Sequence, residues 1–362
     1  MAGKTFKIAT IPGDGVGLEV VEQGIAVLEE AVKNSDVSLE FAFFPWGSDY
    51  YADKGRMMPE DALETLKRFD AIYLGAVGDP RVPDHISLEM LLKIRKGFDQ
   101  YINLRPVKLL EGVDTPLKLA PGAAVDMVVI RENTEGEYSA MGGRFKQGTP
   151  DEVALQIGVF TRKGTERVIR YAFELARKRG RENGRTPLVT NCTKSNALNY
   201  SMVLWDEVFD AVASDYPDVN TDKALVDALC MWMVRKPQYF DVIVASNLFG
   251  DIITDLGAAI QGGMGVAAGA NINPERVYPS MFEPIHGSAP KYKGKYMANP
   301  VAAIYAGAMM LEFLGAVEEA KAVMNAVQSV LKEGKVRTYD LGGSSTTKEM
   351  GKAVAGRINC KI

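Results

Sequence analysis

Short apolar runs of the kind that form buried strands recur along the chain, and most are followed by a segment with helical periodicity. The strand-like runs cover residues 7–11, 39–44, 70–78, 126–131, 187–193 and 240–245. Helical patterns lie between them, at 18–32, 59–69, 88–98, 166–179 and 205–216. This alternation predicts an α/β fold with a largely parallel sheet and helices on both of its faces.

We also assign secondary structure to three segments that lie close to candidate functional residues. Residues 82–87 are expected to form a loop before the helix at 88–98, and residues 223–234 read as one helix. Residues 282–292 contain Pro and Gly at several positions and are expected to form a loop.

A glycine-rich turn, Pro12-Gly-Asp-Gly-Val-Gly17, follows the first strand-like run. It is a weak match to the dinucleotide fingerprint Gly-x-Gly-x-x-Gly, because Leu18 stands where the third glycine belongs. Glycine at these positions still allows the backbone to approach something closely, either a ligand or a neighbouring strand.

Size and charge exclude several classes of protein. The 362 residues are enough for two domains or one elaborate domain, and the net charge of −4 does not favour nucleic acid or an acidic membrane as a partner. The start of the chain lacks the apolar core of a signal peptide, and the apolar stretch 301–314 is too short to span a membrane. We therefore expect a cytoplasmic protein.

The cysteines and histidines limit the possible metal and redox chemistry. Cys192, Cys230 and Cys360 are far apart and odd in number, which predicts neither a disulfide framework nor a zinc knuckle and fits a reducing compartment. With His85 and His286 as its only histidines, one chain is not expected to build a multi-histidine metal site.

Two aspartates follow the strand-like run at 240–245, in the stretch Asn247-Leu-Phe-Gly-Asp251-Ile-Ile-Thr-Asp255. Because Asp251 and Asp255 are four residues apart, a helix places them on one face, where like charges repel unless a cation or basic group lies between them. Carboxylates at the end of a strand suit Mg²⁺ or Mn²⁺. The alternative is that Asp251 interacts favourably with the helix dipole and Asp255 is solvated.

Three arginines, Arg95, Arg105 and Arg131, are placed at the ends of predicted elements. A planar guanidinium matches both oxygens of a carboxylate, so the three together predict a dicarboxylate pocket; each alone could equally form a surface ion pair. Lys194, after another strand-like run, is either a general base or a solvated lysine. Asp227, within an apolar run, is either paired or functional.

Residues 139–162 contain a polar turn followed by a strand pattern at 153–160. We interpret this segment as a hairpin that projects from the body of the protein. Such a hairpin is a candidate for contact with a second subunit, and the alternative is an ordinary surface hairpin.

Taken together, these residues resemble the β-decarboxylating hydroxyacid dehydrogenases, which include isocitrate, 3-isopropylmalate, homoisocitrate and D-malate/tartrate dehydrogenases. The resemblance covers essentially the whole chain. It rests on the three arginines, on Asn247 to Asp255, and on Ile11-Pro-Gly-Asp-Gly-Val-Gly17, Glu132-Asn-Thr-Glu-Gly-Glu-Tyr138, Thr193-Lys-Ser-Asn196 and His286-Gly-Ser-Ala-Pro290. Four further segments are most similar to the D-malate/tartrate branch: Phe44-Pro-Trp-Gly-Ser-Asp-Tyr-Tyr51, Met57-Met-Pro59, Val82-Pro-Asp-His-Ile-Ser87 and Gly97-Phe-Asp-Gln-Tyr101.

The resemblance implies an isopropylmalate-dehydrogenase-like αβα fold with two domains, and not a true Rossmann fold. The first domain, on the dinucleotide side, would combine residues 1–102 and 262–362. The second would comprise residues 103–261 and form a homodimer or higher homo-oligomer through the hairpin arm at about 139–162. Active sites would then be shared between subunits.

The resemblance also implies roles for individual residues in the oxidation and decarboxylation of a malate-type 2-hydroxy acid. Arg95, Arg105 and Arg131 would bind the substrate carboxylates. Asp251 and Asp255, with Asp227 from the partner subunit, would hold Mg²⁺ or Mn²⁺, a Lewis acid for this chemistry, and K⁺ is a further candidate ion. Lys194 from the partner would assist removal of the hydroxyl proton, and Tyr138 would help to protonate the enol carbon.

The implied cofactor is NAD or NADP, held by a loop whose residues are His286, Gly287, Ser288, Ala289, Lys291, Tyr292 and Asn299. NAD-preferring members of the family commonly have an aspartate where Lys291 stands. The pair Lys291-Tyr292, with Tyr339 later, resembles NADP-preferring isocitrate dehydrogenases, although Gly343 replaces the arginine of that set. The D-malate/tartrate branch suggests NAD and the loop suggests NADP, so both stay open.

The substrate is expected to be tartrate or D-malate, and 3-isopropylmalate is the alternative. The helix that would face the substituent on the malate skeleton carries Leu88, Leu91 and Leu92, which could accept an alkyl group. This segment also lacks a tryptophan-glycine pair associated with the D-malate/tartrate branch. An alternative of a different class is a non-catalytic regulatory subunit, whose expected signature, the loss of Tyr138, Lys194 or the aspartates, is absent.

Overall fold

The computed structural model of the protein describes residues 3–120 and 123–358, so Cys360 lies outside the described residues. The chain divides into two compact units. Unit 1 comprises Met1–Gln100, Lys108–Lys118 and Ala258–Ile362, and unit 2 comprises Tyr101–Val107 and Leu119–Gly257. The domain boundaries expected from the sequence differ from these units mainly at residues 108–118. These residues were expected in the second domain, but they belong to unit 1.

Unit 1 is built on strands in the order β2-β1-β3-β12-β11. The pairs β1–β2, β1–β3 and β3–β12 are parallel, and β11 is antiparallel to β12. The strands are β1 (Lys4–Gly13), β2 (Val37–Phe43), β3 (Ala71–Ala76), β11 (Ala268–Ile272) and β12 (Ser280–Pro284). The helices are α1 (Gly17–Val32), α2 (Ser48–Lys54), α3 (Ala62–Leu66), α4 (Asp84–Gly97), α9 (Val301–Leu314), α10 (Val317–Glu333) and α11 (Thr347–Ala355), with short 3₁₀ turns η2 (Met264–Val266), η3 (Pro290–Tyr292) and η4 (Tyr339–Leu341).

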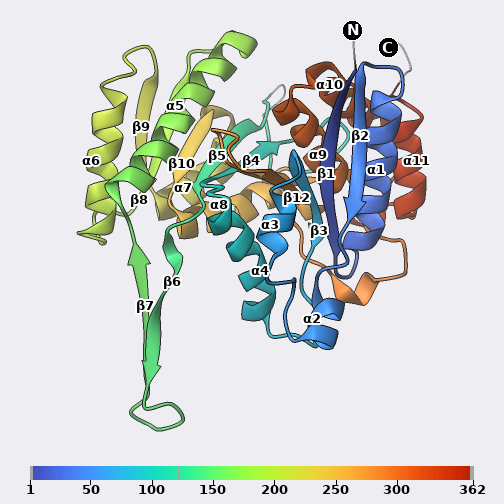
Figure 1. Ribbon diagram of the computed structural model, residues 1–362. Helices are drawn as coiled ribbons and strands as arrows, with labels where there is room; N and C mark the ends of the chain where they lie inside the picture. Colours follow the sequence, from blue (N-terminus) through green and yellow to red (C-terminus); the bar gives the residue numbers. More distant parts are fainter. Residues whose placement is uncertain (1–2, 121–122, 359–362) are drawn as a thin grey trace. The chain divides into compact units, whose positions relative to one another are not determined.

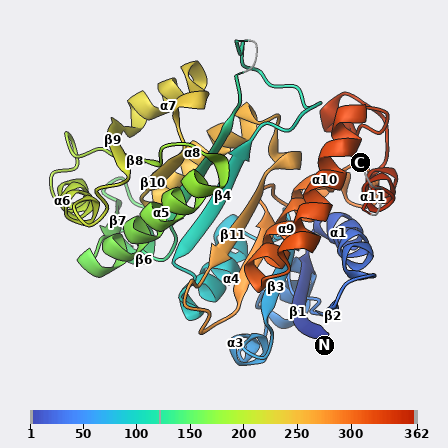
Figure 2. The same cartoon turned by 90° about the horizontal axis from the view of Figure 1, so that it is seen from above.

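The central strand β3 shows why helices cover both faces of this sheet. Successive side chains of a strand point to opposite faces. Ile72 and Leu74 belong to a buried cluster with residues of α3 and α4. Tyr73 points the other way, and its hydroxyl donates a 2.7 Å hydrogen bond to the carbonyl of Ala303 in α9. Figure 2 shows α1, α9, α10 and α11 packed beside one another on that side.

The glycine turn after β1 is filled by the protein's own backbone. A Cβ at Gly13 would lie 2.0 Å from the carbonyl oxygen of Ala76, and a Cβ at Gly15 would lie 1.9 Å from that of Ser288. Both glycines have positive φ. The sequence left open whether these glycines allow the approach of a ligand or of a neighbouring strand. In the structure they allow the close approach of a neighbouring strand and loop.

Unit 2 contains strands in the order β4-β5-β10-β8-β9, in which β5, β10, β8 and β9 run parallel. The strands are β4 (Ile102–Lys108), β5 (Asp126–Glu132), β8 (Leu188–Thr193), β9 (Asn220–Leu225) and β10 (Val242–Ala245). The last residue of β4, Lys108, belongs to unit 1. The helices are α5 (Arg162–Asn183), α6 (Ser201–Ala213), α7 (Val226–Arg235) and α8 (Asn247–Ile260), with a 3₁₀ turn η1 (Pro237–Tyr239).

A separate antiparallel hairpin, formed by β6 (Gly136–Phe145) and β7 (Val153–Val159), extends away from the rest of unit 2 (Figure 1). The hairpin expected at about residues 139–162 corresponds to this pair of strands, which spans residues 136–159. Large apolar side chains on both of its strands are exposed, namely Met141, Phe145, Val153, Leu155 and Ile157.

The predicted α/β class is confirmed, but some elements differ from expectation. Helix α4 begins at Asp84, within the expected loop, where an acidic residue in the first turn favours the helix dipole. Residues 220–225 form strand β9, which pairs only with β8 and is too polar to show a strand pattern. Residues 280–284 form strand β12. This strand was not expected, because it ends in Pro284 and its sequence lacks a clear strand pattern. The helix expected at 59–69 is reduced to α3. Within the described residues, no helix is long and apolar enough to cross a membrane.

Replacement of Gly15 by alanine tests the role of the glycine turn. Gly15→Ala should lower the free energy of unfolding well beyond the approximately 1 kcal/mol expected for alanine at positive φ alone, because its Cβ would meet the Ser288 backbone. Gly55→Ala is the matched control, since Gly55 also has positive φ but has nothing within 4 Å of its Cβ position. Urea unfolding of both variants gives the comparison, and equal losses would contradict the packing role.

Candidate active site

The site residues of unit 2 come from the carboxyl ends of adjacent parallel strands. In the strand register, Arg131 of β5 is paired with Ala245 of β10, which is paired with Cys192 of β8. The residues that follow, including Asn247 and Lys194, therefore leave the same edge of the sheet. Ligand sites of open parallel sheets lie at this edge.

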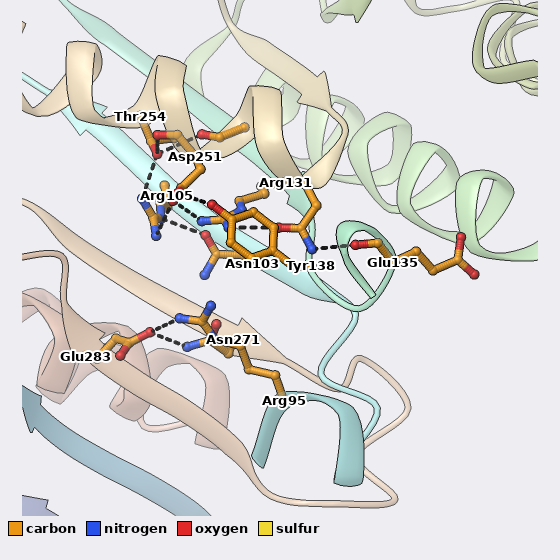
Figure 3. A network of polar contacts seen from close by, with 12 residues as sticks. Arg95, Asn103, Arg105, Arg131, Glu135, Tyr138, Asp251, Thr254, Asn271 and Glu283 are labelled. Carbon is orange, nitrogen blue, oxygen red and sulfur yellow. Dashed lines mark hydrogen bonds and ion pairs between the residues drawn. The ribbon is translucent and has the colours of Figure 1, made fainter. Parts of the chain in front are cut away.

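Arg131 is the centre of a network of buried polar contacts (Figure 3). Its guanidinium forms an ion pair with Asp251, and its Nε and Nη2 donate hydrogen bonds of 3.1 and 2.8 Å to Oδ1 of Asn247. The Asn247 amide in turn donates to the carbonyl of Glu135. On the other side, the Tyr138 hydroxyl donates a 2.9 Å hydrogen bond to Asp251. The network holds Tyr138, a candidate catalytic residue, against a candidate metal ligand.

Arg105, the second predicted arginine, belongs to the same cluster. Its Nε donates to Oδ1 of Asn103 at 2.7 Å and its Nη1 donates to the hydroxyl of Thr254 at 2.6 Å. Its Nη2 lies 3.7 Å from Oδ1 of Asp251. The structure thus brings Arg105, Arg131, Tyr138 and Asp251 together around the first turns of α8.

The aspartates of α8 offer the oxygen donors that Mg²⁺ and Mn²⁺ prefer. Asp251 remains 38% exposed despite its contacts. The pKa of Asp255 is raised from its ordinary value, mainly because the carboxyl is partly removed from water; Arg105 opposes the shift and the charge of Asp251 adds to it. A cation near both carboxylates would relieve their repulsion, so these residues fit a divalent metal. No group of three or more His, Cys, Asp or Glu residues suited to a metal occurs within the described part of one chain.

Lys194 and Asp227, the two residues expected to act in a partner's site, pair with each other. Lys194 Nζ lies 2.9 Å from Asp227 Oδ1, and Asp227 is 67% exposed at the start of α7. The hydrogen bond from Lys194 holds the pKa of Asp227 below its usual value. A turn in which the Lys194 carbonyl accepts from two backbone N–H groups fixes the lysine at the end of β8. Their predicted role in a second subunit's site stays a prediction.

Arg95, the third predicted arginine, belongs to α4 in unit 1 and has a separate set of contacts. Its Nη2 donates a 2.9 Å hydrogen bond to Glu283 of β12, and Asn271 of β11 donates to the same oxygen at 2.7 Å (Figure 3). Both members of the ion pair are buried, with 7% and 10% of their side chains exposed. Leu88, on the same helix, is 36% exposed, and Leu91 packs against the core cluster.

The predicted cofactor loop at 286–299 is anchored to α1 and the turn before it. The Ser288 carbonyl accepts a 2.8 Å hydrogen bond from Val16 N–H, and the Ser288 hydroxyl donates to the Gly78 carbonyl. Further along the loop, Gly294 N–H donates to Glu19, a buried residue in the first turn of α1. Two anchors therefore hold the loop, and the segment between them includes the exposed Lys291.

The residues predicted to contact the dinucleotide differ in how they are held. Burial lowers the pKa of His286, which favours the neutral imidazole. Lys291 lies exposed with its Nζ 4.8 Å from the centre of the Tyr292 ring. The Asn299 amide donates to Asp340 at 3.0 Å and accepts from Val301 N–H at 3.0 Å, so its orientation is fixed. A Cβ at Gly343 would lie 2.2 Å from the carbonyl of Arg337, which closes that position to larger residues.

Several residues that organise the site were missed by sequence reasoning. Asn103, Asn247 and Thr254 orient the two arginines of unit 2, and Glu283 with Asn271 holds Arg95. For Asn103 and Asn247 a signal existed, because one is two residues from Arg105 on a strand and the other directly follows a strand.

The fold and the site define an α/β protein with arginine and aspartate side chains gathered at the carboxyl ends of parallel strands, an arrangement suited to a small carboxylate and a divalent cation. The chain belongs to the isocitrate/isopropylmalate dehydrogenase family, which it matches over residues 7–354. The family resemblance and the fold class expected from the sequence are thereby confirmed.

Two relatives and one crystal structure illustrate the similarity. The chain is 51% identical to a D-malate dehydrogenase [decarboxylating] of Escherichia coli (strain K12) and 50% identical to a tartrate dehydrogenase/decarboxylase of Pseudomonas putida, with 99% of each chain covered in both cases. A crystal structure of isocitrate dehydrogenase from Methylococcus capsulatus superposes with a TM-score of 0.88 at 36% identity, covering 98% of this chain and 100% of that chain.

The ion pair between Arg95 and Glu283 leads to a prediction about stability. Glu283→Gln removes the charge that balances a buried guanidinium and should lower the free energy of unfolding by about 3 kcal/mol. Glu64→Gln is the control, because Glu64 contacts Lys67 while 71% exposed and should give little measurable change. Chemical denaturation of both variants makes the measurement, and similar small losses would contradict a structural role for the buried pair.

Proposed function

We propose that the protein catalyses the metal-dependent oxidation and decarboxylation of a malate-type 2-hydroxy acid with NAD or NADP, and that D-malate or tartrate is the substrate. The observation that carries the proposal is the cluster in which Arg105, Arg131 and Tyr138 surround Asp251. It occurs in a chain about half identical, over nearly its full length, to relatives named for D-malate and tartrate.

Each part of the reaction has a proposed residue. Arg95, Arg105 and Arg131 bind and orient the substrate carboxylates, because their paired donors match carboxylate oxygens. A divalent ion held by Asp251 and Asp255, with Asp227 of a second copy, supplies Lewis-acid chemistry when bound. Lys194 of that second copy takes the hydroxyl proton as hydride leaves C2 for the nicotinamide. After CO₂ departs, Tyr138 helps to return a proton to the carbon.

The proposed assembly is a homodimer or higher homo-oligomer joined through the β6–β7 hairpin. The support is the set of exposed apolar side chains on this hairpin, since a contiguous apolar surface favours contact with another protein surface. Lys194 and Asp227, the two residues proposed to act in the site of a second copy, lie together in one chain. A cytoplasmic location and the domain boundaries expected from the sequence remain predictions.

The choice between NAD and NADP depends on the exposed part of the cofactor loop. Members of the family use NAD(P) and a divalent metal. Lys291 and Tyr292 present a cation beside an aromatic ring, which would attract a 2′-phosphate and offers no acceptor for a ribose 2′-hydroxyl. Gly343 cannot be replaced by an arginine without movement of the Arg337 backbone. The choice between NAD and NADP therefore stays open, and we propose Lys291 as its main determinant.

A second candidate substrate is 3-isopropylmalate. Leu88 is partly exposed on α4, and Leu92 and Arg95 follow it at helical spacings of four and three residues, so the three share one face. An alkyl substituent could therefore pack beside the proposed carboxylate ligand. The regulatory-subunit alternative has no comparable support, because Tyr138, Lys194 and Asp251 are all present.

An absorbance assay for reduced nicotinamide tests the proposed function directly. The purified protein is supplied with Mn²⁺ and K⁺ and with D-malate, the tartrates, 3-isopropylmalate or isocitrate, each with NAD and NADP. Turnover of D-malate or tartrate should exceed that of the other acids. Preference for 3-isopropylmalate would mean that the leucines of α4 determine the substrate.

Lys194→Ala is the control for chemistry in this assay. The variant should lose nearly all turnover, by at least about a hundredfold, while it still binds dinucleotide, because a general base is removed from a site remote in sequence from the cofactor loop. Ordinary activity in this variant would remove Lys194 from the mechanism.

Substitution of Lys291 tests cofactor choice. Lys291→Asp should shift the ratio of kcat/KM values toward NAD by about tenfold or more, because a carboxylate accepts from a 2′-hydroxyl and repels a 2′-phosphate. Lys295→Asp is a matched control, since Lys295 is also exposed and lies farther from Tyr292, with its Nζ 5.9 Å from the ring centre. A ratio that stays unchanged in Lys291→Asp would exclude this residue as the determinant.

A further inference from the structure

Two neutral groups of unit 2 accept hydrogen bonds from Arg105, which also lies beside the carboxylate of Asp251. The arginine is buried, with 7% of its surface exposed, so the direction of its guanidinium is set by protein groups and not by water. Asn103, two residues earlier on β4, accepts from Nε, and Thr254 of α8 accepts from Nη1 at 2.6 Å. A buried charged donor that loses an acceptor bears a large desolvation cost, so both contacts restrict the side chain.

The hydroxyl of Thr254 is suited to this contact because both of its hydrogen-bonding functions are used. A hydroxyl has one donor and two acceptor sites. Thr254 Oγ1 lies 2.8 Å from the carbonyl of Gly250, one helical turn earlier, so its proton is directed to the helix backbone. A lone pair then remains for Arg105 Nη1. With 1% of its surface exposed, Thr254 has no water to replace either contact.

We propose that Thr254 is a positioning residue that sets the orientation of Arg105 for the substrate carboxylate. The inference rests on the proposed function, in which Arg105 binds that carboxylate. Thr254 also lies between Asp251 and Asp255 on α8, so its hydroxyl ties the substrate arginine to the helix that carries the proposed metal ligands (Figure 3). The carboxylate and the cation are thereby held in one fixed relation.

Two substitutions at Thr254 separate the hydroxyl from the shape of the side chain. Thr254→Val keeps the branched shape and removes the acceptor, whereas Thr254→Ser keeps the acceptor and removes a methyl group. Thr254→Val should raise the KM for the hydroxy acid about tenfold and change kcat by less than about threefold, because an interaction made equally in the ground and transition states is lost. Thr254→Ser should restore KM to within about twofold of the parent.

Two further readouts distinguish positioning of Arg105 from a general effect on α8. The Mn²⁺ concentration for half-maximal activity and the KM for dinucleotide should stay unchanged in Thr254→Val. If the substitution instead disturbed α8, the Mn²⁺ requirement would rise, since the aspartates lie on either side of it, and the inference would be overturned. Thr254→Ala provides the same comparison if the valine variant does not fold.

A double-mutant cycle with Arg105→Ala completes the test. If Thr254 acts through Arg105, Thr254→Val should have almost no further effect on KM when Arg105 is alanine. Independent effects of the two substitutions, or a KM for Thr254→Val equal to that of the parent, would overturn the inference while leaving the proposed function intact. An Arg105→Ala variant with the parent's KM would instead show that Arg105 is not a substrate ligand, and both the assignment and the inference would fail.

Discussion

The ion pair between Arg131 and Asp251 is the interaction on which the candidate site depends. It connects the end of β5 to the second turn of α8, and Asn247 closes the connection by accepting two hydrogen bonds from the same guanidinium. Gly250 permits this approach, since a Cβ there would lie 2.5 Å from the Arg131 side chain. With α8 fixed in this way, Asp251 faces Tyr138, and Thr254 reaches Arg105.

Three basic groups of the candidate site share a common arrangement, in which each lies beside an opposite charge of the folded chain. Arg95 pairs with Glu283, Arg131 with Asp251, and Lys194 with Asp227. For the buried guanidinium groups of Arg95 and Arg131, such pairing avoids the cost of an unbalanced buried charge before any ligand is present. Binding of the proposed ligands here would be an exchange of partners, in which substrate carboxylates would compete with protein carboxylates and a cation would compete with guanidinium groups. Selectivity for a ligand would then depend on how well its charged atoms fit the positions of these protein groups, as well as on its net charge.

The sequence singled out charged residues that the structure brings together, because charge at the end of an apolar run is conspicuous and parallel strands bring such ends to one edge. Arg105, Arg131 and Asp251 were identified in this way and Tyr138 through the family resemblance, and the four side chains lie together. The role of Thr254 could not be identified, because a hydroxyl is common throughout a sequence and its partner depends on three-dimensional register. Strands β9 and β12 were missed for a related reason, since a polar strand paired only with β8 and a strand ending in proline lack the expected pattern.

The anchoring of the proposed cofactor loop has a consequence for how such a protein can diversify. Ser288 and Gly294 are fixed to α1 and the turn before it, while Lys291 lies exposed between them. If the loop binds a dinucleotide as proposed, substitutions at the exposed position would change the chemistry offered to that dinucleotide without removing a contact that holds the loop. A change of redox carrier would then leave the residues that maintain the architecture unaltered.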